Sequence, residues 1–474
     1  MGRKRKKEAL FFSRVEVTGV AAEGKALARV DDKVLFIPFA APGDVVDVRI
    51  TKRKRNFMEG SIQKVHKWSE ERVTPFCEHF GTCGGCKWQH LSYERQLHHK
   101  QQQVTDHLVR VGKTDLDKVE VLPIVAAEDT KFYRNKLEYT FSNKKWLSRE
   151  VIDSGETVTT MEALGFHIPV FFDKVLDINK CWLQPEPSND IRLAVKEFAL
   201  GQGMTFFDLR TNVGMLRNLI IRNSSAGELM ILMVFGGKDR AVIDDMMTFL
   251  SERFSQATTI AYMINEKANS SIADLEPVIF RGRPFIEEEM EGLRFQIGPK
   301  SFFQTNSKQA LRLYEIARDF AGLTGSELVY DLYTGTGTIA CFMARHAKKV
   351  IGIEYVQEAV DHAKINAHRN EIDNCTFIAG DMADILNDQF MEKHGYPHVI
   401  ITDPPRAGMH PKVVRQIAES GADRVVYVSC NSATQARDVE MLSEKYEMIK
   451  SQAVDMFPHT QHVENVVLLE RKRG

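Results

Sequence analysis

From about residue 291 to the C-terminus, short apolar runs alternate with helical stretches. The runs at residues 328–333, 350–354 and 398–402 have the pattern of buried strands, and helical patterns lie between them. Strands that alternate with helices in this way form a mostly parallel sheet covered by helices. The pattern therefore predicts a Rossmann-like α/β domain over residues 291–474.

The rest of the chain predicts two further domains, at residues 1–70 and 71–290. The first has five short strand-like runs between turn-forming residues, which is typical of a small OB-like barrel. The second is α+β in pattern, and a helix predicted at about residues 92–111 is expected to pack on the C-terminal domain. The predicted barrel strands are residues 12–20, 26–30, 34–38, 44–51 and 57–65, and those of the second domain are residues 137–141, 163–167, 215–222 and 229–235.

Positive charge gathers at the N-terminus although the whole chain carries a net charge of −1. Residues 1–70 hold 16 Lys and Arg against 9 Asp and Glu, mostly in clusters at residues 3–7 and 49–55. Each cluster alone would suit a solvated segment, but two in one small domain favour a phosphate-binding face and an RNA partner. No apolar run reaches the length of a membrane helix and no signal sequence opens the chain, so we expect a cytoplasmic protein without a membrane partner. Nothing in the sequence indicates an obligate protein partner.

A glycine-rich loop follows the strand at residues 328–333. Gly335-x-Gly337-x-x-Ala340 fits a dinucleotide fingerprint, and Glu354 ends the next strand, where it could bind ribose hydroxyls. This motif alone is compatible with an NAD site and also with a tight turn that binds no ligand. Asp331 and Asp381, at the ends of two strands, favour S-adenosylmethionine because they could pair with its ammonium and adenine amino groups.

Two further strand ends carry reactive groups. Asp403-Pro-Pro-Arg406 follows the run at 398–402, and Cys430 lies directly after the strand predicted at 424–429. Ligands of α/β sheets bind at the carboxyl edge of the strands, so Cys430 beside Asp403 is a candidate nucleophile. Cys341 and Cys375 are interpreted as packing thiols.

Three of the seven cysteines fall within ten residues, as Cys77-x5-Cys83-x2-Cys86. An odd number of cysteines without an export signal argues against a disulfide framework and favours a metal or cluster site. Cys181 is the candidate fourth ligand by elimination. Four thiolates suit either zinc or an iron–sulfur cluster, and the spacing does not decide between them.

Together these motifs resemble the RNA uracil-C5 methyltransferases, over about residues 11–470. The resemblance rests on Phe302-Phe-Gln304-Thr-Asn306, the glycine loop, Asp403-Pro-Pro-Arg406, Val428-Ser-Cys430-Asn431 and Phe457-Pro-His-Thr-x-His-Val-Glu464. It is strongest to the ribosomal RNA branch, which carries an N-terminal TRAM domain and a [4Fe–4S] cluster. The implied fold is a Rossmann-like S-adenosylmethionine methyltransferase domain preceded by a TRAM barrel and an α+β domain with the cluster.

The resemblance also implies roles for individual residues. Cys430 would add to C6 of uracil, Glu464 would remove the C5 proton, and Asp403 would bind the uracil edge or position the nucleophile. Thr334 and Thr338 stand where relatives often have Cys and Asn. The implied S-adenosylmethionine residues are Gln304, Tyr333, Glu354 and Asp403, with Thr338 and Asp381 as additions, and the implied [4Fe–4S] ligands are Cys77, Cys83, Cys86 and Cys181, with zinc as the alternative.

The predicted function is therefore S-adenosylmethionine-dependent formation of 5-methyluridine in 23S ribosomal RNA. Transfer-RNA uracil methylation is the alternative within the same chemistry. A non-catalytic iron–sulfur protein that binds RNA or senses redox state is the alternative from another class, although the complete set of Cys430, Asp403 and Glu464 argues against it.

Overall fold

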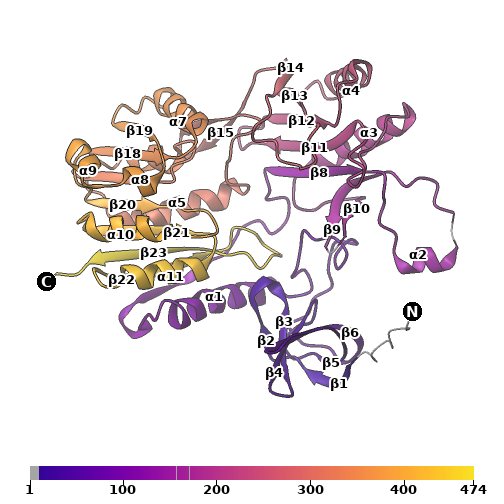
Figure 1. The fold of residues 1–474 in the computed structure, drawn as a ribbon, viewed down its shortest axis with the longest axis horizontal. Coiled ribbons are helices and arrows are strands. Elements are labelled where there is room, and N and C mark those ends of the chain that lie inside the picture. The colour runs from indigo at the N-terminus through magenta and orange to yellow at the C-terminus, as the bar shows by residue number, and fades with distance from the viewer. Residues whose placement is uncertain (1–9, 156, 170, 474) are drawn as a thin grey trace, which may run out of the picture.

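The computed structural model describes residues 10–155, 157–169 and 171–473. The chain forms a small N-terminal barrel, a central α+β unit and a C-terminal α/β unit (Figure 1). The basic cluster at residues 3–7 lies outside the described residues. Among the helices of the described ranges, none is long and apolar enough to cross a membrane.

The N-terminal unit is a curled six-stranded sheet in the order β1-β5-β6-β4-β3-β2. The run predicted as one strand at residues 12–20 forms two strands, because the chain changes partner at Val17 and Thr18: Val17 N donates to Asp44 O and Thr18 N to Leu27 O. This crossing brings the two edge strands together around an apolar core. The strands are β1 Phe11–Glu16, β2 Gly19–Val20, β3 Ala26–Val30, β4 Lys33–Ile37, β5 Val45–Arg53 and β6 Phe57–Lys67.

The C-terminal unit contains an eight-stranded sheet in the order β19-β18-β17-β20-β21-β23-β22-β7. Its first five strands run parallel, as the alternating pattern predicts, whereas β23 is antiparallel to both neighbours. Its strands are β7 Glu120–Val125, β17 Leu328–Leu332, β18 Lys349–Glu354, β19 Cys375–Ala379, β20 Val399–Thr402, β21 Arg424–Ser429, β22 Tyr446–Val454 and β23 Glu464–Arg471.

Helices cover both faces of this sheet and bury a separate apolar core on each. One face packs against α5 Ser307–Ala321, α6 Thr338–Ala344 and α7 Gln357–Arg369. The other packs against α1 Tyr93–Arg110, α8 Met382–Ile385, α9 Asp388–His394, α10 Pro411–Glu419 and α11 Ser432–Leu442. Helix α1 begins at the N-cap Ser92, and its apolar residues Val104 and Leu108 are fully buried in this second core. A mixed α/β fold, as predicted, is confirmed.

The central unit is a seven-stranded sheet in the order β10-β9-β8-β11-β12-β13-β14. Strands β11 and β12 are almost wholly buried, because helices cover one face and the chain around residues 272–279 covers the other. The elements are β8 Lys136–Ser142, α2 Arg149–Ser154, β9 Ala163–Ile168, β10 Phe171–Asp177, α3 Ser188–Gly201, β11 Leu216–Asn223, β12 Leu229–Phe235, α4 Arg240–Arg253, β13 Thr259–Ile264 and β14 Val278–Gly282, followed by the hairpin β15 Ile286–Met290 and β16 Leu293–Ile297.

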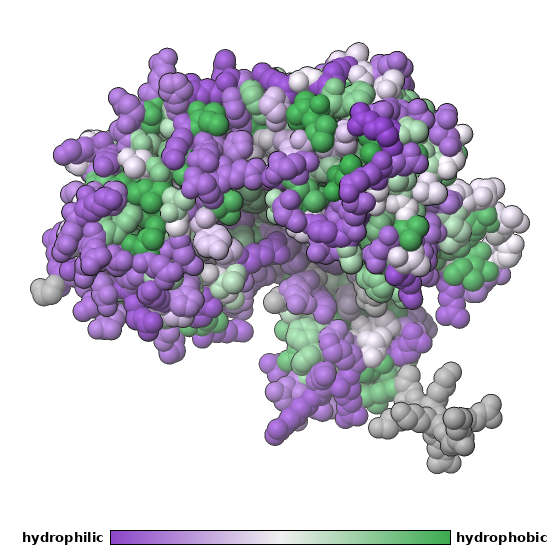
Figure 2. Space-filling view, turned by 45° about the horizontal axis from the view of Figure 1, so that its top comes forward, coloured by the Kyte–Doolittle hydropathy of each residue, from purple (hydrophilic) through white to green (hydrophobic). Residues whose placement is uncertain are grey.

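The three units meet around a recess. The space-filling view shows a mainly hydrophilic face that is hollowed where the barrel approaches the two larger units (Figure 2). Helix α1 and β7 follow the cysteine loop in sequence, yet β7 pairs with β22 of the C-terminal sheet. The chain therefore crosses between units more than once, which places the cysteine loop and the C-terminal sheet edge close together.

Candidate active site

A cavity of about 610 Å³ opens at the carboxyl edge of the C-terminal sheet. Cys430 lies one residue past β21, Asp403 lies one residue past β20, and both side chains line the cavity. Glu464 lines it as well, but it is the first residue of β23 and only 4% exposed rather than part of a loop. The antiparallel direction of β23 brings its first residue to the edge where the parallel strands end.

Asn431 fixes the segment that carries the thiol. Its side-chain oxygen accepts from Ala433 N at 3.1 Å and so caps α11. Its side-chain nitrogen donates to Arg406 O at 2.9 Å, which ties the β21 end to the Asp403-Pro-Pro-Arg406 turn. The two strand ends are thus joined by one side chain, and the thiol and the carboxyl are held at one wall of the cavity.

The glycine loop forms another wall, through Tyr333 and Gly335. Gly335 has φ +55°, and no atom lies within 4 Å of where its Cβ would be, so a ligand can approach its backbone closely. Tyr333 also has a positive φ, of 64°, which is rare for a bulky residue and is typical of functional turns. Glu354 holds this loop by accepting from Gly335 N at 3.1 Å and from Val356 N at 2.9 Å.

The structure brings together six of the residues predicted for the reaction and the cofactor. Cys430, Glu464, Asp403, Gln304, Tyr333 and Glu354 all line the cavity. Thr338 and Asp381 are not among its lining residues. Thr338 begins α6 and is 8% exposed, whereas Asp381 is exposed and caps α8 through Ala383 N at 2.9 Å.

Burial raises the pKa of Cys430, Glu464 and Asp403, and neighbouring carboxyls raise it further for Cys430 and Glu464. Burial, and then the carboxyls of Glu464 and Asp403, raise the pKa of the Cys430 thiol to about 11, against the opposing effect of Arg406. Burial, and then Asp403, raise the pKa of Glu464 to about 8. Burial raises the pKa of Asp403 to about 7. Without bound ligands the site therefore keeps its thiol protonated at neutral pH.

Other lining residues were not singled out from the sequence. Lys300, which pairs with Glu358 at 3.1 Å, and His362 on α7 reach the cavity near the glycine loop. Phe457, the first residue of the motif that ends at Glu464, lines the cavity as well. Lys300 lies four residues before Gln304 and could have been suspected from that position, but His362 is one of several polar residues on α7 and carries no sequence signal.

The segment that precedes Glu464 is anchored to α1 by a buried ion pair. Lys100 Nζ lies 2.5 Å from Asp455 Oδ1, and both side chains are 0% exposed. Tyr93 Oη donates to Asp455 Oδ2 at 2.9 Å, and the Gln96 side chain contacts both His459 N and His459 Nδ1. The position of Glu464 therefore depends on α1, which is remote from it in sequence.

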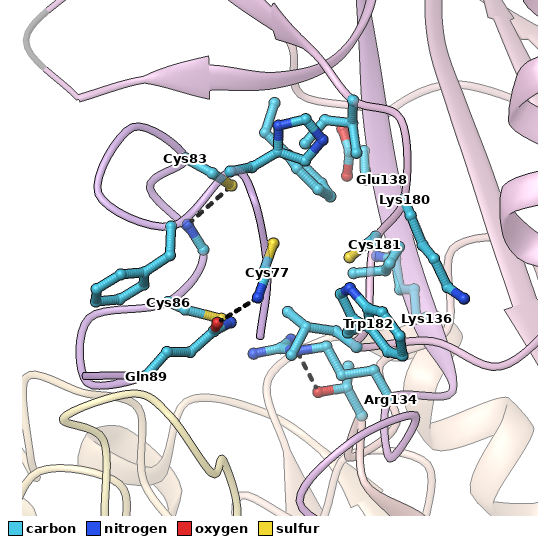
Figure 3. Close-up of a pocket in the computed structure, with 18 residues that line it drawn as sticks. Cys77, Cys83, Cys86, Gln89, Arg134, Lys136, Glu138, Lys180, Cys181 and Trp182 are labelled. Carbon is cyan, nitrogen blue, oxygen red and sulfur yellow. Dashed lines mark hydrogen bonds between the residues drawn. The ribbon is translucent and has the colours of Figure 1, made fainter. Parts of the chain in front are cut away.

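The four predicted ligand cysteines line a second cavity, of about 360 Å³ (Figure 3). Cys77, Cys83 and Cys86 come from one loop, and Cys181 faces them from the segment after β10. Burial raises the pKa of the Cys86 thiol to about 12 and that of Cys181 to about 11. In the parts of the chain that the structure describes, no three His, Cys, Asp or Glu side chains converge closely enough to hold one metal ion.

The cysteine loop also contacts the Glu464 segment. Lys87 N and Trp88 N, directly after Cys86, both donate to His459 O, at 2.8 and 3.0 Å. Thr305 lines both cavities, so the two sites are neighbours.

The chain is similar to known proteins over nearly its whole length. The sequence model of the tRNA (Uracil-5-)-methyltransferase family matches residues 285–472, and that of the TRAM domain matches residues 13–62. An RNA methyltransferase of Bacteroides thetaiotaomicron is 55% identical over 454 residues, which cover 95% of this chain and 100% of that protein. One from Porphyromonas gingivalis is 54% identical, over 96% of this chain and 99% of its own.

A solved structure is similar over nearly the whole chain. The tRNA (uracil-54, C5)-methyltransferase of Pyrococcus abyssi, in complex with S-adenosyl-L-homocysteine, has a TM-score of 0.73 and 26% identity, and covers 96% of this chain and 100% of its own. These relatives favour an enzyme over the non-catalytic alternative. The chain belongs to the S-adenosylmethionine-dependent RNA (uracil-5-)-methyltransferase family and carries an N-terminal TRAM domain.

Proposed function

We propose that the protein methylates C5 of a uracil in ribosomal RNA, with Cys430 as the covalent nucleophile. The observation that supports this is the convergence of Cys430, Asp403 and Glu464 on one cavity that the glycine loop also lines. Uracil C5 is a weak nucleophile, and a sulfur–C6 bond would move electron density onto C5.

Glu464 is proposed as the base that completes the reaction. After C5 has gained a methyl group it must lose its proton, so that the electron pair of the C5–H bond can re-form the C5–C6 double bond and expel the Cys430 thiolate. A carboxyl with its pKa raised to about 8 is a stronger base, once ionised, than a solvated one. Asp403, with its pKa raised to about 7, can donate a hydrogen bond to the uracil edge when protonated or accept one when ionised.

The cofactor side of the cavity fits S-adenosylmethionine, which supplies the methyl group when it is bound. The open space above Gly335 admits a ligand against the loop backbone, and the Glu354 carboxylate stands beside it to accept ribose hydroxyls. Gln304 and Tyr333 complete the wall between the loop and Asp403. Thr338 and Asp381 would act indirectly, Thr338 by starting α6 under the loop and Asp381 by capping α8.

We further propose that Cys77, Cys83, Cys86 and Cys181 hold a [4Fe–4S] cluster. The four thiols line one cavity, and four thiolates suit such a cluster, with one zinc ion as the alternative. The cluster would order the loop that contacts His459 and take no part in methyl transfer.

Cys77, Cys83, Cys86 and Cys181 line the second cavity, which we call the thiol cavity. Ribosomal RNA is proposed as the substrate because this cavity occurs together with a TRAM domain, as in the ribosomal RNA branch of the family that the sequence resembles. The Pyrococcus abyssi structure, described as a tRNA methyltransferase, supports transfer RNA as the second candidate. Mapping 5-methyluridine in both RNA classes after deletion of the gene would decide between them.

The chemistry is tested with Cys430→Ala. This variant should bind RNA and S-adenosylmethionine normally, yet transfer no methyl group and form no covalent adduct with 5-fluorouridine-substituted RNA. Cys375→Ala is a matched control, since this thiol lies at the start of β19 and not in the cavity. Turnover by the Cys430 variant would rule out the covalent route.

A further inference from the structure

An aromatic and cationic cluster lies beside the thiol cavity, formed by Phe76, Phe132, Trp182, Lys131 and Lys180. The Phe132 and Trp182 ring centroids are 5.5 Å apart, and those of Phe76 and Trp182 are 5.8 Å apart. Lys131 Nζ lies 4.2 Å from the Phe76 ring and Lys180 Nζ lies 4.1 Å from the Trp182 ring. We call these five residues the aromatic platform.

Phe132 has a backbone conformation that is rare for a bulky residue. It has φ +56°, in the left-handed region that bulky residues avoid, and its residue is 37% exposed. Two backbone hydrogen bonds to the Cys181 segment fix it: Phe132 N donates to Trp182 O at 2.7 Å and Arg134 N donates to Leu183 O at 2.8 Å. Strain of this kind persists where the surroundings impose it and is concentrated at ligand sites.

The two lysines of the platform have no acidic partner. Within the described part of the chain, neither Lys131 nor Lys180 lies within ion-pair distance of a carboxylate, although Lys144 and Lys145 on the same unit are both paired. Both are exposed. Two unpaired cations over the half-buried Phe76 and Trp182 rings, next to the exposed Phe132 ring, match a ligand that offers negative charge beside a flat π surface.

The platform borders the active site. Asn135, three residues after Phe132, donates from its backbone to Thr305 O at 2.8 Å and from its side chain to Gln304 O at 2.9 Å, and Gln304 lines the active-site cavity. Phe76 contacts the His459 ring at 5.0 Å, on the segment that leads to Glu464. Trp182 and Lys180 lie beside Cys181 at the margin of the thiol cavity (Figure 3).

We propose that the aromatic platform binds an unpaired nucleotide of the RNA near the methylated uracil. Its base stacks on the Phe132 and Trp182 rings, and Lys131 and Lys180 neutralise the adjoining phosphates. This inference rests on the proposed RNA methylation and adds that the substrate is single-stranded at this point, since a base inside a duplex has no free face to stack.

Phe132→Gly and Phe132→Asn test the stacking, because both residues tolerate a positive φ while removing the ring. Binding of a fluorescent oligouridylate by the full-length protein should weaken at least about fivefold in both variants, which is the lower limit for losing one stacked base. Phe132→Tyr should bind like wild type. Phe172→Asn is the matched control, because Phe172 is 66% exposed with Arg210 over its ring, but Arg210 is paired with Asp173. Unchanged affinity in the Gly and Asn variants would overturn the proposal.

Replacing the two lysines, whose side chains are exposed, gives an independent measurement. In the Lys131→Gln/Lys180→Gln variant, the slope of log Kd against log salt should fall by about 1.4, because each contact with single-stranded phosphate contributes about 0.7. Inorganic polyphosphate should lose affinity for this variant but not for Phe132→Asn, since it has no bases. An unchanged slope would refute the phosphate contacts.

Failure of the platform and failure of the proposed function can be told apart. Wild-type protein that forms the adduct with 5-fluorouridine RNA, while the platform variants bind oligouridylate as wild type does, would refute the platform alone. Absence of the adduct in wild type would refute the uracil chemistry, and the binding data would still decide the platform.

Discussion

The Cys430 thiol should react slowly in the ligand-free protein and should become more reactive when Glu464 is replaced by Gln. Two carboxyls raise the pKa of Cys430 in addition to burial, and that of Glu464 itself is raised to about 8. As the pH rises above 8, Glu464 becomes negatively charged and opposes ionisation of the thiol. Glu464→Gln removes this charge without changing the volume of the side chain, so the pKa of Cys430 should fall.

The size of the effect follows from the pKa. At pH 8 a thiol with a pKa of about 11 is about 0.1% thiolate, whereas one at the ordinary value of 9.0 is about 10% thiolate. The higher basicity of the perturbed thiolate recovers a factor of about 6 to 10 in intrinsic nucleophilicity. Cys430 should therefore be alkylated about tenfold more slowly than an unperturbed thiol. Glu464→Gln should recover only part of this factor, because burial is the largest cause and remains.

The assay is the rate of iodoacetamide alkylation of the peptide containing residue 430, followed by mass spectrometry between pH 7 and 10.5. Arg406→Gln is the control of opposite sign, because Arg406 lowers the pKa of Cys430 and its removal should slow the reaction. Equal rates in wild type and Glu464→Gln across this range would contradict the electrostatic argument, as would a wild-type pKa near 9.

Four further predictions concern other parts of the protein. Glu464→Gln should accumulate the covalent complex with natural RNA on denaturing gels, because elimination needs the base, and a variant that forms no complex would instead indicate a structural role. Anaerobically purified protein should be brown with about four irons per chain, and Cys181→Ser should lose both properties, whereas one zinc in colourless protein would refute the cluster. Lys100→Met should lower the free energy of unfolding by about 3–5 kcal/mol, since it leaves Asp455 buried and unpaired. Adding Asp455→Asn should recover part of this loss in a urea titration, and additive effects would argue against the pair. Replacing Arg53, Lys54 and Arg55, which are exposed on the β5–β6 hairpin, by Gln should reduce the salt slope of RNA binding by up to about 2, and an unchanged slope would leave them as a solvated turn.

Local sequence patterns predicted much of the architecture. The parallel strands of the C-terminal sheet could be predicted from apolar runs separated by helical stretches. A strand that is buried on both faces of a sheet is apolar along its whole length, so each run marks one such strand. The strand-end positions of Asp403 and Cys430 follow from the same pattern, since the carboxyl ends of parallel strands meet at one edge. The sequence predicted five barrel strands, whereas the structure has six, because the run at residues 12–20 forms both β1 and β2. The break between them depends on a hydrogen bond from Val17 N to Asp44 O, and the hydrophobic periodicity does not reveal this contact.

Only the tertiary structure decided which distant segments meet. Glu464 reaches Cys430 because β23 runs antiparallel beside β21, and nothing in the residues around Glu464 encodes that direction. The strained Phe132 lies against Trp182 because backbone hydrogen bonds join two segments about fifty residues apart in sequence. The hydrophobic periodicity of the sequence indicates which face of each helix or strand is buried. The direction of a strand and the contacts of a loop depend instead on which sheet edges and cavities the rest of the chain leaves free. Strand direction and loop contacts are therefore decided only when the units pack together.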